Sequence, residues 1–295
     1  MNQRQTKWVG IVGLGRVGSA LAFSLQHLGY EIVVASRRFS PGQKAVIRDR
    51  QFAVVSLAEI GRKADLLFLA TPDGIITKIA EKLAQDRQLA GKGVLHLSGA
   101  HSSKVLEPLR KTGAFLGSLH PLQSFANVEQ AIENLPGSYF TYQGDEALLG
   151  EVAKLVQDLN GFLKILQSPE SKVVYHAGAC LVSNYLVALA SLGVRCLSEA
   201  GFSEEEARRA LTPLMQGTVN NIAALPLTKA LTGPIVRGDL AVVRNHLKAL
   251  SAELPEVRQA YRVLSPLLGK LALEGNNIKA EVYEELLGIL GDNQR

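Results

Sequence analysis

The stretch "WVGIVGLGRVGSALAFSLQHLG" (residues 8–29) decides the fold of the first half of the chain. A short apolar run is followed by residues with the apolar spacing of a helix, and three glycines between them form a G-x-G-x-x-G pattern. In a strand–turn–helix context this pattern binds the pyrophosphate of a dinucleotide, because the glycines permit a tight turn, close backbone approach and close helix packing. The candidate cofactor-binding residues of this loop are Gly13, Leu14, Gly15, Arg16, Val17 and Gly18.

Apolar runs and helical stretches then alternate up to about residue 167. Further strands are expected at 31–38, 52–56, 65–72, 93–99, 113–121, 137–144 and 161–167. Continuous apolar strands that alternate with helices predict a parallel sheet covered on both faces. The fold class expected here is therefore an α/β doubly wound sheet of the Rossmann type.

The pattern changes after Ser168-Pro169, where the remainder becomes helical with breaks at prolines and glycines. We therefore expect a dinucleotide-binding domain over residues 1–168 and an all-α C-terminal domain over residues 169–295.

Composition narrows the classes of protein and partner. The chain has 295 residues, 47% hydrophobic and 20% charged, with a net charge of +5 from scattered lysines and arginines, which is weak evidence for nucleic-acid binding. Two cysteines are too few for a disulfide framework or a zinc site, so no metal is expected. The N-terminus lacks an apolar signal core, and no stretch is expected to reach the length of an uninterrupted membrane span. A cytoplasmic protein without nucleic-acid or membrane partners is the resulting expectation.

The end of the second strand indicates which dinucleotide binds. An NAD site usually has Asp or Glu there to hold the ribose hydroxyls, whereas this chain has Ser36, Arg37 and Arg38. A guanidinium suits the 2′-phosphate of NADP by charge-assisted bonding. We therefore expect NADP (NADPH) as the cofactor, unless both arginines are solvated loop charges.

Later strands end in polar motifs, beyond the carboxyl ends where an open α/β sheet presents ligands. The motifs "ATPD" (70–73) and "HLSGAH" (96–101) supply further cofactor-binding candidates, namely Ala70, Thr71, Pro72 and Ser98. In "GSLHPLQSF" (117–125) a strand is expected to end at His120 because Pro121 breaks its ladder. The substrate-binding candidates of this motif are His120, Gln123 and Ser124.

A polar stripe interrupts the apolar helix expected in "SKVVYHAGACLVSNYLVAL" (171–189). At about 100° per residue, Lys172, His176 and Ser183 share a narrow stripe with Asn184 at its flank. Such a stripe costs free energy unless it is paired or lines a wet cleft. His176 is the candidate proton donor, Lys172 would stabilise developing charge, and Ser183 and Asn184 would orient a carbonyl. Alternatively, Lys172 reaches solvent while His176 and Asn184 bond nearby backbone groups.

A Gly-Pro break in "TGPIVRGD" (232–239) makes a helix unlikely there and fixes a bend. Arg237 in this bend is a candidate for binding a substrate carboxylate through two parallel donors. The alternative is a surface pair between Arg237 and Asp239.

Taken together, the glycine loop, "ATPD", "HLSGAH", "SLHPLQSF", "YHAGACLVSNYL" and "TGPIVRGD" resemble a bacterial family of oxidoreductases that pair a Rossmann-like domain with a C-terminal domain of unknown function. This family is similar to 6-phosphogluconate, 3-hydroxyisobutyrate and prephenate dehydrogenases, pyrroline-5-carboxylate reductase and ketopantoate reductase. The resemblance implies that the first helix after the domain boundary faces the nicotinamide and that the helical domain forms a homodimer. In 3-hydroxyacid dehydrogenases that helix carries Lys and, one turn later, Asn, whereas here Lys172 is followed at that spacing by His176.

Two functions fit these features. The first is an NADP-dependent reductase or dehydrogenase of a small anionic substrate, either an oxo or hydroxy acid, such as a ketopantoate-like or prephenate-like acid, or a cyclic imine. The second is a non-catalytic NADP(H)-binding sensor, which needs no proton donor facing the nicotinamide. A deazaflavin in the same groove is a further alternative to NADP.

Overall fold

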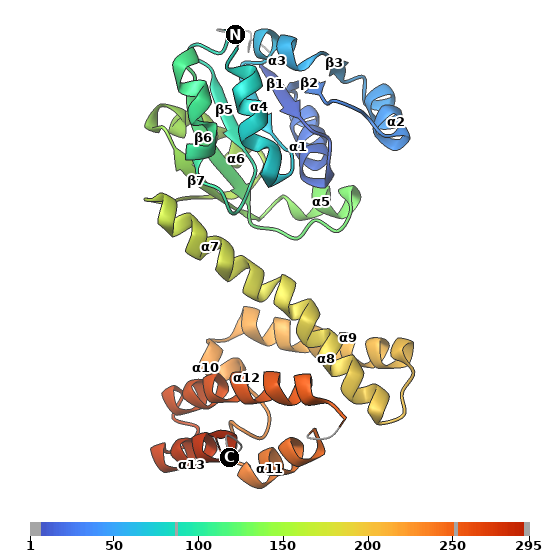
Figure 1. Cartoon of the computed structure of the whole chain (residues 1–295), viewed down its shortest axis with the longest axis vertical. Helices are drawn as coiled ribbons and strands as arrows, with labels where there is room; N and C mark the ends of the chain where they lie inside the picture. Colours follow the sequence, from blue (N-terminus) through green and yellow to red (C-terminus); the bar gives the residue numbers. More distant parts are fainter. Residues whose placement is uncertain (1–6, 86–87, 251–252, 292–295) are drawn as a thin grey trace. The chain divides into compact units, whose positions relative to one another are not determined.

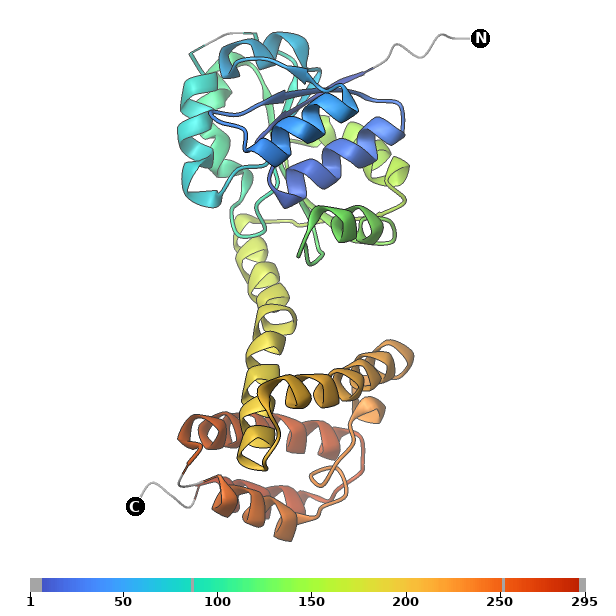
Figure 2. The same cartoon turned by 90° about the vertical axis from the view of Figure 1, so that its right-hand side faces the viewer.

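The computed structural model describes residues 7–85, 88–250 and 253–291, which form two compact units, 1–183 and 184–295. The first unit is a sheet with helices on both faces, and the elements described in the second unit are all helices (Figures 1 and 2). The predicted fold class is confirmed. The helix α7 (Pro169–Val182) groups with the first unit; the domain boundary at residue 168 stays a prediction.

The sheet of the first unit has eight strands in the order β3-β2-β1-β4-β5-β6-β7-β8. They are β1 (Trp8–Val12), β2 (Glu31–Ala35), β3 (Ala53–Val54), β4 (Leu66–Leu69), β5 (Gly93–His96), β6 (Phe115–Pro121), β7 (Tyr139–Gly144) and β8 (Phe162–Ile165). The first six are parallel, but β7 is antiparallel to β6 and β8 is parallel to β7. The expectation of a wholly parallel sheet is therefore wrong for the last two strands. The chain reverses after β6, where the Leu122 amide donates to the Tyr139 carbonyl over 2.8 Å.

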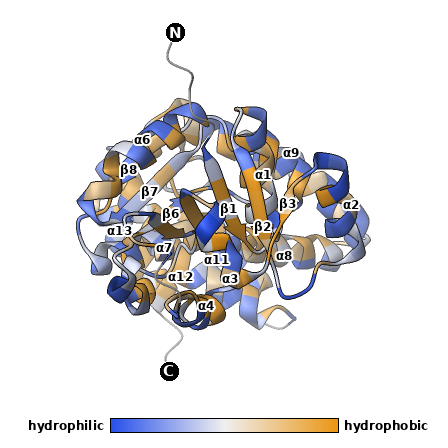
Figure 3. Ribbon diagram, turned by 90° about the horizontal axis from the view of Figure 1, so that it is seen from above, coloured by the Kyte–Doolittle hydropathy of each residue, from blue (hydrophilic) through white to orange (hydrophobic). Residues whose placement is uncertain are grey.

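Helices cover both faces of this sheet because its strands alternate apolar side chains between two cores. Val9 and Ile11 of β1 enter one core, together with α1, α5 and α6, whereas Val12 enters the other, with α3, α4 and η2. Figure 3 shows the hydrophobic colour along β2. The helical segments are α1 (Arg16–His27), α2 (Pro41–Arg50), α3 (Leu57–Lys63), η1 (Asp73–Ile75), α4 (Ile76–Leu83), η2 (Ser103–Thr112), α5 (Val128–Asn134), η3 (Glu146–Leu148) and α6 (Leu149–Asp158).

The carboxyl ends of β1, β4, β5 and β6 lie side by side along one edge of the sheet, because these four strands are parallel neighbours. The segments that follow them are the glycine loop, 70–73, 97–101 and the chain after Pro121. This edge is where open α/β sheets bind ligands. The topology thus collects several of the predicted site motifs in one place.

The strand β6 does not end at His120, contrary to the expectation from sequence, but continues to Pro121. Pro121 pairs with Phe140 as the last residue of the strand. On the other side β5 ends at His96, opposite Ser118, so β6 has a single neighbour beyond that point. A proline is tolerated there because no second strand requires its amide.

The second unit comprises α8 (Asn184–Glu199), α9 (Glu204–Ala224), α10 (Leu227–Ala230), α11 (Leu240–Ala249), α12 (Pro255–Glu274) and α13 (Ala280–Gly291). Its core gathers apolar residues of α11, α13 and the 231–239 segment, among them Ile235, Val243 and Leu286. A Cβ on Gly269 of α12 would lie 2.6 Å from Leu286, so glycine permits α12 and α13 to pack closely.

One stretch of the described chain, Pro169–Glu199, is long and apolar enough to cross a membrane by length and composition. The expectation that no stretch would reach this length is therefore wrong. Its apolar window is not buried within the structure. A helix that packs on protein passes the same test, so this property carries no further conclusion.

The close approach in the glycine loop leads to a stability prediction. A Cβ on Gly18 would lie 2.2 Å from the Gly13 carbonyl oxygen, whereas a Cβ on Gly15 would meet no atom within 4 Å. Gly18→Ala is expected to lower the free energy of unfolding by about 1–3 kcal/mol through overpacking, despite the better helix propensity of alanine. Gly15→Ala is the control for an added methyl group in the same loop and should cost less, because it loses only the preference for glycine over alanine at the N-cap of α1. Denaturant unfolding checks both, and equal stabilities of the two variants would contradict the packing argument.

Candidate functional site

The glycine loop has the geometry expected of a pyrophosphate site. Gly13 has φ +99°, a left-handed conformation that favours glycine. Gly15 is the N-cap of α1, and the first turn of this fully described helix contains no acidic residue. Open space beside Gly15 and the helix N-terminus together suit an anionic group. These residues fit a dinucleotide by their own geometry.

Two side chains hold the loop in place. The Leu14 carbonyl accepts hydrogen bonds from the Ser19 hydroxyl at 3.2 Å and from the Gln43 side-chain amide at 2.5 Å. Arg16 donates to the Phe125 carbonyl at 3.5 Å, and Val17 packs against the core. Gln43, which connects the start of α2 to the loop, was not predicted from the sequence.

Ser36, Arg37 and Arg38 follow β2 and are exposed. The Ser36 hydroxyl donates to the Arg38 carbonyl at 2.9 Å. Within the described residues, no carboxylate forms an ion pair with either guanidinium. Both charges are therefore available to a phosphate beside the loop. Exposed and unpaired guanidinium groups are equally what the alternative of solvated loop charges predicts.

The residues after β4 and β5 differ in whether their polar atoms form hydrogen bonds within the protein. The Ala70 amide donates to the Val12 carbonyl, which fixes the start of the Ala70-Thr71-Pro72 turn. The Thr71 hydroxyl is buried without a hydrogen-bond partner among the described residues. The Ser98 hydroxyl instead accepts from the amides of Ala100 and His101, so it organises its own loop.

Lys172 is fully buried, and its Nζ has no hydrogen-bond partner in the described part of the chain. The alternative of a lysine that reaches solvent is therefore not the conformation observed. Burial lowers the pKa of Lys172 to about 8, and the Asp73 carboxylate offsets part of that fall. A buried ammonium costs free energy unless an opposite charge or acceptor satisfies it, so this atom marks a place for a ligand.

His120 and His176 approach each other beside Gly99, which follows β5. Their ring centroids are 6.2 Å apart with the planes at 89°. His120 Nδ1 lies 2.7 Å from the hydroxyl of Tyr175, the residue before His176 on α7. The Nδ1 of His176 is buried without a partner within the described ranges, and its Nε2 lies 3.6 Å from Cys180 Sγ. Burial, with the Lys172 and His176 charges, lowers the pKa of His120 to about 3, so this ring is neutral.

His96 has a structural role at the end of β5. It ends β5, is fully buried, and its Nε2 lies 3.0 Å from the Ser102 carbonyl. Its Nδ1 accepts from the Ser98 amide at 3.2 Å, so this ring nitrogen is unprotonated. Burial lowers the pKa of His96 to about 3, which keeps the ring neutral.

Other candidates lie apart from this cluster or are engaged elsewhere. Ser183 is the exposed C-cap of α7, and Asn184 is exposed and belongs to the second unit. The Gln123 amide donates to the Asn134 carbonyl and the Ser138 hydroxyl, and Ser124 is exposed. Their roles stay predictions.

Arg237 lies in a turn rather than a helix, as its Gly-Pro break predicted. Its guanidinium forms an exposed pair with Asp239, with Nε 2.9 Å from the carboxylate. That is the geometry of the surface-pair alternative. Its role in binding a carboxylate stays a prediction.

Three residues at the site were not predicted from the sequence, namely Gly99, Thr141 and Tyr175. Tyr175 follows Lys172 by three positions and precedes His176, so helical spacing could have placed it on the polar stripe. Thr141 of β7 lies near the Tyr175 hydroxyl and partly offsets the rise that burial causes in the pKa of Tyr175. It pairs with His120 across β6 and β7, a register that depends on the unforeseen antiparallel pairing.

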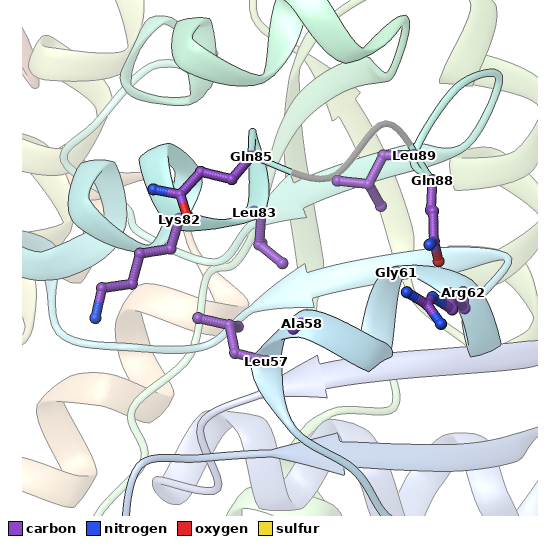
Figure 4. A pocket seen from close by; sticks show the side chains of 9 residues that line it. All are labelled: Leu57, Ala58, Gly61, Arg62, Lys82, Leu83, Gln85, Gln88 and Leu89. Atoms are coloured by element: carbon purple, nitrogen blue, oxygen red, sulfur yellow. The ribbon is translucent and has the colours of Figure 1, made fainter.

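A separate hollow of about 350 Å³ lies between α3 and α4 (Figure 4). It is lined by apolar residues such as Leu57 and Leu83 and by the polar side chains of Arg62, Lys82 and Gln88. It contains none of the predicted site residues. The candidate site is therefore the cluster at the sheet edge.

This combination of sheet edge, glycine loop and polar helix defines a dinucleotide-binding protein of the Rossmann type. Residues 2–121 match the Rossmann-like domain, and residues 138–267 match a domain of unknown function (DUF2520). The chain belongs to the proteins that pair these two domains, which confirms the family resemblance.

The chain is similar to a crystal structure of a protein from Thermotoga maritima, with 26% identity and a TM-score of 0.74 over 91% of this chain and 99% of that one. It is also similar in fold to pyrroline carboxylate reductase from Plasmodium falciparum with NADP bound, with 14% identity and a TM-score of 0.58 over 90% and 98% of the two chains. A curated relative is ketol-acid reductoisomerase (NADP(+)) from Leuconostoc mesenteroides, 25% identical over 68% of this chain. The chain matches 59% of the length of that relative.

The buried ammonium leads to a prediction about the pH dependence of stability. The folded protein holds the Lys172 proton less tightly than the unfolded chain, so stability should rise between about pH 8 and the ordinary lysine pKa of 10.5. Lys172→Met keeps the volume and removes the charge, and should raise the free energy of unfolding at pH 7 by about 1–3 kcal/mol. Denaturant unfolding across this pH range measures the difference, which should shrink toward pH 10.5. A Lys172→Met variant less stable than wild type at pH 7 would mean that the ammonium is paired.

Proposed function

We propose that this protein is an NADPH-dependent reductase that transfers a hydride to a small oxo acid or a related imine, or the reverse dehydrogenase. It uses NADP because Arg37 and Arg38 replace the acid that holds ribose hydroxyls in NAD sites. The NADP in the Plasmodium reductase and the NADP(+) in the name of the Leuconostoc enzyme support this choice.

A single observation carries the proposal: Lys172, His176 and Thr71 each hold a buried polar atom that has no partner among the described residues, as do Thr141 and Gln88. Thr71 follows β4 at the ligand-binding edge. Lys172 and His176 are one turn apart on α7, and their charges both act on His120 at the end of β6. A binding-only sensor has no use for a buried ammonium and imidazole at this edge, so these groups favour an enzyme.

The residues of the chain can supply what carbonyl reduction requires. When bound, NADPH supplies the hydride that reduces the carbonyl or imine carbon. Lys172 stabilises the negative charge that develops on the substrate oxygen. His176 gives a proton to that oxygen, so the product leaves as a neutral alcohol. Burial excludes water and strengthens both interactions.

Substrate chemistry follows from the charges around the site. Lys172 is positively charged at pH 7, since its pKa is lowered only to about 8. The carboxylate near it is that of Asp73, which is exposed. A small anionic substrate, such as a branched oxo acid, fits this balance. Arg237 remains a second candidate for binding its carboxylate.

The cofactor preference gives the first test. Wild type is expected to bind NADPH more tightly than NADH, with the 2′-phosphate contact worth roughly 1.5–3 kcal/mol. Arg37→Ala should lose most of that difference, whereas Arg48→Ala, an exposed arginine of α2, is the matched control. Fluorescence titration of both cofactors measures the affinities. Equal affinities in wild type would exclude the proposed contact.

The proton donor gives the second test. His176→Ala should lower kcat by about a hundredfold or more while NADPH still binds. Val174→Ala changes a side chain on the exposed side of α7 and should keep wild-type rates. Steady-state kinetics with NADPH and a turned-over oxo acid or imine decide the matter. An unchanged kcat in His176→Ala would mean that another group is the proton donor.

We also propose a homodimer through the helical unit. Two large apolar side chains of α9, Leu214 and Ile222, are exposed and lie within about 80° of each other around the helix, and its C-cap residue Leu225 is exposed as well. Contiguous exposed apolar surface of this kind marks an interface. Leu214→Asp should therefore convert a dimer to a monomer in light scattering after size exclusion, and Gln216→Asp should not. A wild-type monomer, or a dimer unaffected by Leu214→Asp, would contradict this surface as the interface.

A further inference from the structure

Gly99 separates two imidazoles that both point at it. A Cβ at this position would lie 2.6 Å from His176 Nδ1 and 2.8 Å from His120 Nε2. Real Cβ atoms do not come so close to nitrogen, so glycine keeps open the space between the rings. The two nitrogens lie within the span that one oxygen atom bridges with two hydrogen bonds of about 2.8 Å each.

The proton on His120 can be placed from its other contact. This ring is half-buried and neutral, so one nitrogen carries a proton and the other accepts. Its Nδ1 lies 2.7 Å from the Tyr175 hydroxyl, whose pKa burial raises, so the phenol keeps its proton. A hydroxyl that keeps its proton can donate it to Nδ1, the nitrogen within hydrogen-bond distance. If the phenol donates to Nδ1, the ring proton is on Nε2, the atom that faces Gly99.

We propose that the space beside Gly99 binds the carbonyl oxygen of the substrate between His120 Nε2 and His176 Nδ1, and that Tyr175 is the positioning residue that makes His120 the Nε2–H donor. This inference rests on the reductase function and deepens it. Its role for His120 is more specific than the substrate contact that the sequence indicated.

Two donors on one oxygen have a chemical consequence. During hydride addition negative charge develops on that oxygen, and donors fixed in a dry site stabilise it without reorganisation. His120 holds the oxygen through its Nε2–H, and His176 passes a proton from Nδ1 to the oxygen as the carbon–hydrogen bond forms. The lowered pKa of His120 makes this ring neutral, and a neutral imidazole is too weak an acid to give up its remaining proton, so His120 keeps its Nε2–H throughout.

The tautomer can be measured without knowing the substrate. Nitrogen-15 NMR of histidine-labelled protein, with His120 assigned through His120→Gln, is expected to show the Nε2–H tautomer in wild type. Tyr175→Phe removes the phenol hydroxyl and should lose this preference. If Tyr175 only packs its ring against His120, the tautomer should stay unchanged. An Nδ1–H tautomer in wild type, or an unchanged tautomer in Tyr175→Phe, would overturn the role of Tyr175.

The oxygen site is tested by filling it. Gly99→Ala should bind NADPH within about twofold of wild type but lower kcat by about a hundredfold or more, the usual scale for a lost oxyanion donor. Gly150→Ala, where a Cβ meets no atom within 4 Å, controls for the added methyl group. With NADP⁺ bound, oxamate should shift both histidine ring signals in wild type but not in Gly99→Ala.

The outcomes separate this inference from the reductase proposal. Wild-type turnover by Gly99→Ala would overturn the oxygen site and leave the reductase standing. Histidine shifts with oxamate in a protein that oxidises no NADPH with any oxo acid or imine would support the site and overturn the reductase. If NADP⁺ binds and oxamate leaves both rings unshifted, the oxygen site is overturned.

Discussion

The candidate site depends on the buried ammonium of Lys172. A buried positive charge without an acceptor is costly, and in the described part of the chain no carboxylate or other acceptor forms a hydrogen bond with its Nζ. Its charge also acts on His96 and His120, which burial already keeps neutral. The result is an electropositive edge with neutral imidazoles. This arrangement favours the binding of an anionic ligand and does not stabilise the fold.

Local sequence patterns predicted most of the first unit. The glycine spacing, the apolar strand runs and the change to helices after Pro169 depend on neighbouring residues, and the structure confirms the fold class they indicate. The reversal at β7 was not predicted, because antiparallel pairing with β6 depends on where the 122–138 connection returns. The prediction that the strand ends before Pro121 was wrong for the same reason, because the effect of a proline depends on which neighbours the strand has at that point.

The site could be predicted only in part. Helical spacing placed Lys172 and His176 on one stripe, and the structure has both at the first unit's polar cluster. The same periodicity gave no reason to separate them from Ser183 and Asn184, which are exposed. Contacts between residues far apart in the sequence could not be predicted. Tyr175 contacts His120 only because α7 lies beside the end of β6. Gly99 carries no side chain, and its importance appears only from what would fill its place.

The central claim is that unpartnered groups at the sheet edge serve reduction by NADPH. The direct measurement is NADPH oxidation by wild type and His176→Ala against a panel of oxo acids and imines, with NADH and a deazaflavin as controls. We predict turnover of at least one small anionic oxo acid or imine with NADPH, and loss of about a hundredfold or more in His176→Ala. NADPH binding without turnover of any member of the panel, or turnover that His176→Ala retains, would contradict it.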